Sequence, residues 1–322
     1  MSFDDNYSAL NDGLSTDSRV PPRSIHRTCS IDSVDTEAFR TSDALAAGTS
    51  PGALRGPRFF APTRGVRLAG PARTLADVCR ALSLVLDPST AFSHTTALRL
   101  LDVELPWRIA QDQSIHVVTP ARQDRPDRQG VVSHFCGQPN LATVRHHGLL
   151  VTSAAQTWLH LSHRLTTDEL VVLGDAMLRR QHQATTPDEL RTLTESTRKM
   201  KGLAKARVAL DLLQPGTDSS METRARLLLV HAGLPCPVVN RAAVDDLGRF
   251  LALPDMSYPA RRIAIEYDGD VHRTDPATWR RDVERRQRLE AAGWIIVTAT
   301  ADDVPRHPER FVARVRAALQ KR

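Results

Sequence analysis

Aromatic residues are scarce in this sequence, at 5% of 322 residues. Proteins that bind single-stranded nucleic acid stack bases on aromatic side chains, so the composition argues against that class. No segment approaches the ~18 consecutive apolar residues of a membrane-spanning helix, and the opening MSFDDNYSALNDG lacks the basic and apolar parts of a signal peptide. We therefore expect a cytoplasmic protein that has no membrane partner.

Cysteine is rarer still, and its four positions are widely spaced. Cys29, Cys79, Cys136 and Cys236 form no CxxC pair. This spacing fits neither a disulfide framework nor a cysteine-based zinc site, so we expect reduced thiols.

Charge and length leave more options open. Lysine and arginine together number 43 against 37 acidic residues, a formal net charge of +6. This surplus is compatible with a polyanionic partner such as DNA, and equally with a basic protein that binds no polyanion. The chain is long enough for two domains, each with its own core.

Composition along the chain suggests three parts. Residues 1–40 are rich in Ser, Asp, Thr and Arg and have few bulky apolar positions, so we expect them to be disordered, or to precede the true start codon. Residues 41–213 predict a mostly helical domain with a few strands. The breaker sequence QPGTD, at 214–218, separates it from a domain over residues 219–322.

The first domain carries clear helix signals. Leu75, Val78, Cys79, Leu82 and Leu86 share one helical face. AFSHTTALRLL predicts another helix with Ser93 as its cap, SIHVVTP and GVVSHF predict strands, and residues 153–213 are expected to be helical throughout.

The last hundred residues alternate between helix and strand signals. We expect helices over 220–231 and 275–292, strands near 237–244, 250–256 and 262–267, a buried strand WIIVTAT, and a closing helix PERFVARVRAALQ. This order predicts an α/β fold in which helices sandwich a central mixed sheet.

The strand end IAIEYDGDVH, residues 263–272, gathers acids. Glu266 lies eleven positions after Asp255, across a turn expected to contain Ser257 and Pro259. Two adjacent antiparallel strands would bring these carboxylates together around a hard cation such as Mg²⁺ or Mn²⁺, with the Tyr267 carbonyl as a further ligand. A solvated strand end is the alternative interpretation.

PDMSYPARRIAIEYDGDVH and DVERRQRLEAAGWIIVTAT, together with their order over about 219–319, resemble the PD-(D/E)XK nucleases, in particular the branch related to very-short-patch-repair endonucleases. The resemblance implies a restriction-endonuclease-like fold and metal-dependent cleavage of DNA. It assigns catalytic roles to Glu222, Asp255, Glu266, Asp268 and His272, with the metal held by Asp255 and Glu266.

One position departs from that pattern. Asp268 stands where most of the superfamily has a lysine, which would orient the attacking water. An aspartate can only bind metal or accept a proton. The imidazole of His272 titrates near neutral pH and would have to supply the missing acid–base function.

Each of these residues also has a structural interpretation. Glu222 follows Ser219 with the spacing of a capping box, and Asp268 with Gly269 could form a turn. Asp255 could start a turn and Glu266 could be exposed. Arg280 and Arg281 are the expected phosphate contacts if DNA covers the site, although their basic helix face could simply be solvated.

TRGVRL, FSHTTALRLL, TSAAQTWLHLSHRL and LGDAMLRR make the region from about 41 to 207 resemble AbiEi-type antitoxins of abortive-infection systems. The resemblance implies a protein partner for this region. The winged-helix DNA-binding module usual in that group would have to lie in TSDALAAGTSPGALRG, which is too short for a complete one. His94 could be a catalytic or contact residue, but we favour a helix-start histidine satisfied by its neighbours. We assign His146 and His147 no role.

Two functions follow from this sequence. The first is a Mg²⁺-dependent endonuclease that acts on DNA in phage defence or DNA repair. The second is a nuclease fold without turnover, which serves as a DNA-binding or antitoxin-type regulator. The acids and His272 favour the enzyme, whereas the missing lysine favours the regulator.

Overall fold

The computed structural model describes residues 37–139, 141–268 and 276–321. For residues 276–281 it describes the backbone alone. The α/β class expected from the sequence is confirmed: helices alternate with several sheets. The disorder expected for residues 1–36 lies outside the described residues. Residues 38–40, which were expected to be disordered as well, form a strand instead.

That strand, β1 (Ala38–Arg40), belongs to a small antiparallel sheet. It pairs with β3 (Val66–Ala69), which also pairs with β2 (Phe59–Phe60). The short helix α1 (Thr41–Ala46) and the 3-10 turn at Ala53–Arg55 lie between β1 and β2 in sequence. Pairing across 26 or more residues orders β1, which local composition could not reveal.

A five-stranded mixed sheet follows, with the order β6-β5-β4-β8-β7. Its strands are β4 (Ala91–Phe92), β5 (Ile115–Thr119), β6 (Val131–Phe135), β7 (Thr143–His146) and β8 (Leu149–Thr152). The region therefore holds more sheet than the few strands expected, because β4, β7 and β8 are too short to show a period. The face of α2 (Leu75–Ser83) that carries Cys79 and Leu82 packs against this sheet, as its spacing predicted.

Two helices, α3 (His94–Leu100) and α4 (Trp107–Ala110), lie between β4 and β5 in the chain. Four more follow β8: α5 (Ala154–Leu161), α6 (Thr167–Met177), α7 (Pro187–Ser196) and α8 (Leu203–Leu210). Residues 153–213 are thus four helices joined by loops, and the capping boxes at Thr166 and Thr186 start two of them. Trp158 is fully buried among them and donates a hydrogen bond to the Leu170 carbonyl at 2.8 Å. Among the described helices, none combines the length and apolarity that crossing a bilayer demands.

The last region is built on a four-stranded mixed sheet with the order β14-β13-β12-β9. The strands are β9 (Val238–Val239), β12 (Met256–Tyr258), β13 (Ile263–Asp268) and β14 (Ile295–Thr300). The expected strands near 237–244 and 250–256 are each split. Their other halves, β10 (Ala243–Val244) and β11 (Phe250–Ala252), form a separate hairpin.

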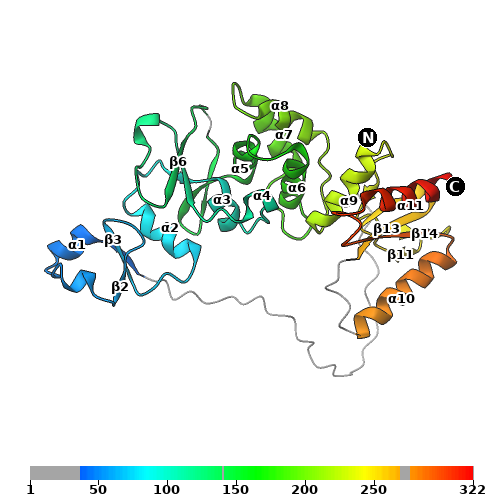
Figure 1. Ribbon diagram of the computed structural model, residues 1–322, viewed down its shortest axis with the longest axis horizontal. Helices are drawn as coiled ribbons and strands as arrows, with labels where there is room; N and C mark the ends of the chain where they lie inside the picture. Colours follow the sequence, from blue (N-terminus) through cyan, green and yellow to red (C-terminus); the bar gives the residue numbers. More distant parts are fainter. Residues whose placement is uncertain (1–36, 140, 269–275, 322) are drawn as a thin grey trace, which may run out of the picture. The chain divides into compact units, whose positions relative to one another are not determined.

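Helices cover both faces of this sheet (Figure 1). α9 (Ser220–His231) and α11 (Pro308–Gln320) share a core with Ile263 and Ile265 on one face, whereas α10 (Pro276–Ala291) shares a core with Ala264 on the other. Odd-numbered and even-numbered residues of β13 therefore face different helices, as the period of a strand requires.

Helix α9 contributes to two cores. Leu227 packs among α5, α6 and α8, whereas Leu229 packs against the last sheet. Arg226, on the same helix, is fully buried. Its Nη2 donates to Oδ2 of the equally buried Asp175 of α6, at 2.9 Å. The Asp175 carboxylate also accepts from the Thr223 hydroxyl and the Gln214 amide. Arg226 donates further to the Leu212 carbonyl, while its buried Nε has no hydrogen-bond partner among the described residues.

Removing one member of this pair should be costly. We expect Arg226→Met to lower the free energy of unfolding by about 3–5 kcal/mol, because it leaves the Asp175 carboxylate buried without its cation. The double variant Asp175→Leu/Arg226→Met should lose less unfolding free energy than the sum of the losses in the two single variants. Urea unfolding of the full chain measures these differences, and additive losses would contradict the coupling. Arg108→Met, which removes an exposed partner of Glu169, is the control and should cost under about 1 kcal/mol.

Candidate functional site

Strand register places two of the sequence-predicted acids side by side. β12 and β13 are antiparallel, with Met256 opposite Ile265. The same register continued by one residue sets Asp255 opposite Glu266, and opposite residues of antiparallel strands project from the same face. Met256 and Ile265 belong to the core beneath α9 and α11. Both acids therefore lie on the other face, toward α10. Ser257, expected in the intervening turn, is a buried residue of β12 instead.

Asp255 is held by the backbone of the neighbouring strand. Its Oδ2 accepts a hydrogen bond from the Tyr267 amide at 2.7 Å. Burial raises the pKa of the Asp255 carboxyl to about 6; the Tyr267 amide opposes this rise and the charge of Glu266 adds to it. The two acids are thus close enough to interact electrostatically.

Glu266 is 8% exposed and contacts a cation from α10. Nη2 of Arg285 donates to its Oε2 at 3.1 Å. Burial raises the pKa of the Glu266 carboxyl, and the positive charges of Arg285 and Arg286 oppose the rise. The sequence marked Arg285 only as part of a basic helix face; the fold sets it against the acids.

Glu222 lies near Asp255 but is engaged by the start of its own helix. Its two carboxylate oxygens accept from the Asp218 amide at 3.0 Å and from the Ser219 hydroxyl at 2.9 Å. Burial raises the pKa of the Glu222 carboxyl, and the charge of Asp255 adds to the rise. Glu222 therefore combines the capping arrangement with proximity to the other acids.

The remaining predicted residues are described only in part. Asp268 ends β13, half-buried, opposite Thr300 of β14. His272 and the side chains of Arg280 and Arg281 lie outside the described residues, so their expected roles in acid–base chemistry and phosphate contact stay predictions.

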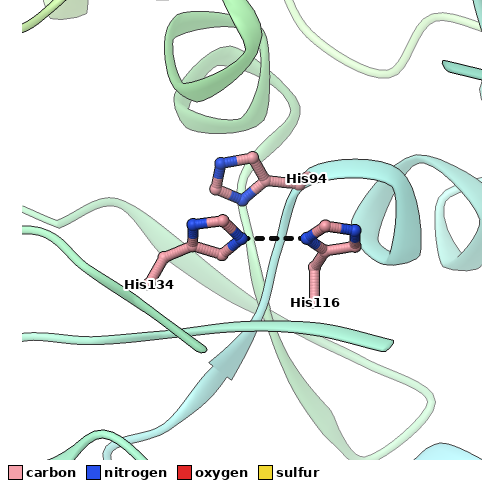
Figure 2. Close-up of side chains that lie close together, drawn as sticks. All are labelled: His94, His116 and His134. Carbon is pink, nitrogen blue, oxygen red and sulfur yellow. Dashed lines mark hydrogen bonds between the residues drawn. The ribbon is translucent and has the colours of Figure 1, made fainter. Parts of the chain in front are cut away.

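A second group of ionisable side chains lies in the earlier region. His94, His116 and His134 each offer a ring nitrogen, and these three atoms lie within 4.8 Å of one another (Figure 2). The His94 and His134 rings stack with centroids 3.8 Å apart, and the His160 ring lies 5.2 Å from that of His94. Among the residues that the structure describes, this is the group of three whose donor types and distances suit a metal ion.

Three elements bring these histidines together. His116 and His134 stand on the parallel strands β5 and β6, where Val118 pairs with His134, so the two rings are offset by two residues on one face. His94 opens α3 with φ of +52°, in the left-handed region that non-glycine residues seldom adopt. Ser93 precedes it, and the Ser93 hydroxyl contacts His94 Nδ1 at 3.0 Å instead of capping the helix as expected.

Burial keeps these imidazoles neutral. It lowers the pKa of His134 and of His160 to about 4, and it lowers the pKa values of His94 and His116 too. The positive charge that each neighbouring ring would carry if protonated lowers the pKa of His94 further. Neutral imidazole has a free lone pair, which is the form that binds metal.

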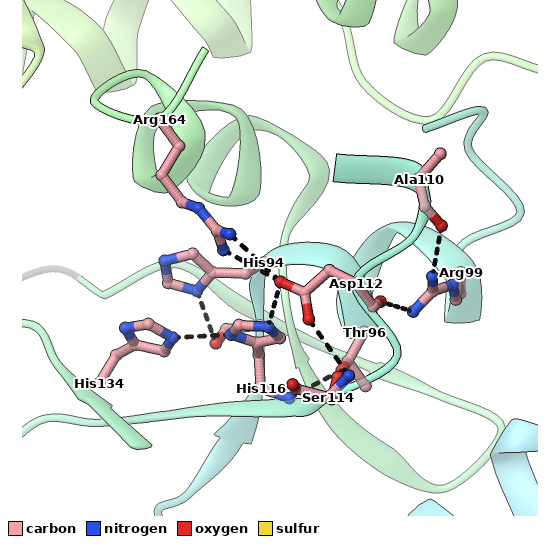
Figure 3. A network of polar contacts seen from close by, with 10 residues as sticks. His94, Thr96, Arg99, Ala110, Asp112, Ser114, His116, His134 and Arg164 are labelled. Carbon is pink, nitrogen blue, oxygen red and sulfur yellow. Dashed lines mark hydrogen bonds and ion pairs between the residues drawn. The ribbon is translucent and has the colours of Figure 1, made fainter. Parts of the chain in front are cut away.

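A polar network orients His116 (Figure 3). Asp112 Oδ2 lies 3.0 Å from His116 Nε2 and also accepts from Arg164 at 3.2 Å. Burial alone would raise the pKa of the Asp112 carboxyl, but hydrogen bonds from Ser114, together with the electrostatic interaction and hydrogen bond with His116, outweigh this and lower it. Arg99 holds the loop by donating to the carbonyls of Asp112 and Ala110.

The cluster borders a cavity of about 620 Å³. His94, His134 and His160 line it together with His163, Cys136 and the basic residues Arg198, Lys199 and Lys201. Sequence reasoning missed this site. Successive histidines of the cluster lie 22 and 18 positions apart with no ligand motif. The parallel pairing of β5 with β6 and the placement of the start of α3 bring them together.

The raised pKa of Asp255 has a measurable consequence. The folded state binds this proton more tightly than the unfolded state, so the group destabilises the fold as pH rises from about 4 to about 6. We therefore expect the free energy of unfolding of Asp255→Asn, measured in EDTA, to rise relative to that of the wild type by on the order of 2–3 kcal/mol from about pH 4 to about pH 6. This corresponds to about 1.4 kcal/mol per pKa unit. Chemical unfolding at several pH values tests this.

Asp245→Asn is the matched control for that measurement. Backbone and side-chain hydrogen bonds from Arg249 lower the pKa of this half-buried carboxyl. The wild-type group therefore stabilises the fold as pH rises, and Asp245→Asn should remove that gain. If Asp255→Asn and the wild type show the same dependence of stability on pH, the raised pKa of Asp255 is contradicted.

Comparison with known proteins places the chain in a family. It is 30% identical over 208 residues to two Mycobacterium tuberculosis proteins: Uncharacterized protein MT2308 of strain CDC 1551 / Oshkosh, and Uncharacterized protein Rv2248 of strain ATCC 25618 / H37Rv. The match covers 65% of this chain and 74% of each relative. No family model matches the chain, and neither does any solved structure. The extent of the match shows that the chain belongs to the same family as these two mycobacterial proteins.

Proposed function

We propose that this protein is a metal-dependent phosphodiesterase that cleaves DNA, and that its active site is built on the last sheet. The observation that carries the proposal is the convergence of Asp255 and Glu266 on the face toward α10. The resemblance to PD-(D/E)XK nucleases favours the same pair of acids. The basic net charge of +6 is compatible with a DNA substrate.

The acids fit a hard divalent cation. Asp255 and Glu266 present carboxylate oxygens, the ligand type that Mg²⁺ and Mn²⁺ prefer. Both carboxyls have raised pKa values because they are buried, so a cation between them would offset the cost of ionising both. When bound, Mg²⁺ would neutralise the negative charge that develops on the phosphate during hydrolysis.

Arg285 supplies a positive charge where the motif has lost its lysine. Asp268 stands at the lysine position and cannot stabilise an anion, whereas Arg285 reaches Glu266 from α10. A guanidinium is charged at every physiological pH and can donate to a phosphate through several N–H groups. In this proposal, Arg285 holds Glu266 in place and faces the scissile phosphate.

The ion pair between Arg285 and Glu266 also favours a second function. It already neutralises Glu266, and the carboxylate of Glu222 accepts hydrogen bonds from Asp218 and Ser219. A site whose acids are satisfied internally has less need of a metal. The protein would then bind DNA, or a protein partner through its earlier region, as an antitoxin-type regulator without turnover.

Plasmid cleavage distinguishes these functions. With Mg²⁺ or Mn²⁺, we expect the wild-type protein to nick or linearise supercoiled DNA, and Asp255→Ala and Glu266→Ala to lose at least about 100-fold in rate. Glu290→Ala removes an exposed acid of α10 and should cleave normally. Retention of DNA without cleavage, unaffected by either acid variant, would support the regulator and overturn the enzyme.

Substitution of Arg285 tests the source of the positive charge. We expect Arg285→Gln to lower the cleavage rate by about 100-fold, since one preorganised donor at a developing anion contributes about that much. Single-turnover rates at saturating DNA measure the effect. Arg288→Gln, on the same helix, alters an exposed residue and serves as the control. Faster cleavage by Arg285→Gln would show that this arginine competes with the metal.

A further inference from the structure

The histidine cluster lies outside the site proposed for DNA cleavage and has different chemistry. We propose that His94, His116 and His134 bind one transition-metal ion of the Zn²⁺ type, and that its remaining coordination position takes a phosphate-bearing anion from the adjoining cavity. Three imidazoles suit zinc, copper or nickel better than magnesium, which prefers oxygen. Three protein ligands and one open position are the usual composition of a catalytic zinc site.

The tautomer of His116 follows from its partners. Asp112 is a carboxylate and accepts, so His116 Nε2 carries the proton and donates to Asp112 Oδ2 at 3.0 Å. The lone pair is then on His116 Nδ1, directed at His134 Nε2 at 2.9 Å (Figure 2). A carboxylate that fixes the tautomer of a histidine is the usual outer support of a zinc ligand. Asp112 is therefore the positioning residue of the site.

Metal binding would exchange one bridging proton for the ion. Without metal, His134 Nε2–H must donate to the His116 Nδ1 lone pair. With metal, both nitrogens contribute lone pairs, and the proton of His134 moves to its Nδ1. His134 lines the cavity, so solvent can carry the proton between the two nitrogens.

Two features of the cluster reduce the stability of the fold and are unexpected in a core that serves packing alone: backbone strain at His94 and an unpaired nitrogen on His160. His94 adopts φ of +52°, a strained conformation that persists where the surroundings require it. Nδ1 of His160 is buried and has no hydrogen-bond partner among the described residues. His160 Nε2 receives a contact from the Gln156 amide nitrogen at 3.0 Å, so Nδ1 carries the unsatisfied proton. A donor beside the cavity would suit an anion.

The cavity itself indicates the class of ligand. Its volume of about 620 Å³ is that of a small-molecule site. Arg198, Lys199 and Lys201 line it, and no acidic residue is among its described lining. Three cations and an N–H donor beside a metal favour a phosphate group over a neutral ligand.

Metal titration of the full chain tests the proposal. Protein stripped with EDTA should bind one Zn²⁺ by calorimetry, and one Co²⁺ with the visible absorption of a nitrogen-rich, four-coordinate site. The variant Asp255→Ala/Glu266→Ala should bind both ions as the wild type does, which separates this site from the acids of the last sheet. Failure of the stripped protein to bind either ion would overturn the proposal.

Single substitutions identify the ligands. His116→Ala and His134→Ala should each weaken Zn²⁺ binding more than about 100-fold, and the isosteric Asp112→Asn about 10–100-fold. The control is His146→Ala/His147→Ala, which removes two neighbouring histidines of the β7–β8 turn and should bind normally. Circular dichroism checks folding. Wild-type affinity in folded Asp112→Asn and His134→Ala would overturn the assignment.

Inorganic phosphate probes the open position. Added to the Co²⁺-loaded protein, it should change the visible spectrum, and the concentration required should rise about 10-fold in Lys199→Ala/Lys201→Ala, because this variant removes two of the three cations that line the cavity. A spectrum that phosphate does not change would overturn the assignment of an anion to this position, even if the ion itself binds.

Discussion

The antiparallel pairing of β12 with β13 is the constraint on which the acidic site depends. It sets Asp255 opposite Glu266 in a place where water is largely excluded, and two neighbouring buried carboxylates cannot both ionise cheaply. The structure meets this cost with the Tyr267 amide and the Arg285 guanidinium. A bound cation would offset this cost more completely. Whether it binds beside Arg285 or is excluded by it is the physical difference between the proposed enzyme and the proposed regulator.

The histidine cluster avoids the desolvation energy of a buried charge. Its imidazoles stay neutral, so they can stack without strong repulsion and keep their lone pairs. One carboxylate, Asp112, orients His116, and Arg164 forms an ion pair with that carboxylate. Nitrogen and oxygen donor sets therefore lie in different parts of one chain. The two sites would select different metals and can be tested independently.

Helix α9 takes part in two of the hydrophobic cores of the described residues. One face packs with α6 and the other with the last sheet, and Arg226 is tied to Asp175 between them. Glu222 sits in the first turn of this helix, near Asp255. Strain or loosening at the Asp175–Arg226 pair would therefore reach the acidic site through the position of α9.

Local patterns in the sequence determined the α/β class, the amphipathic face of α2, the start of α7 at Thr186 and the acidic character of β13, because periodicity and capping act within a few residues. They also singled out Asp255 and Glu266. Tertiary structure alone decided that β1 is ordered, that β10 and β11 leave the main sheet, that Arg285 is the cation beside Glu266, and that His94, His116 and His134 meet. These outcomes depend on strand pairing and helix packing between residues far apart in the chain, which no short window of sequence contains.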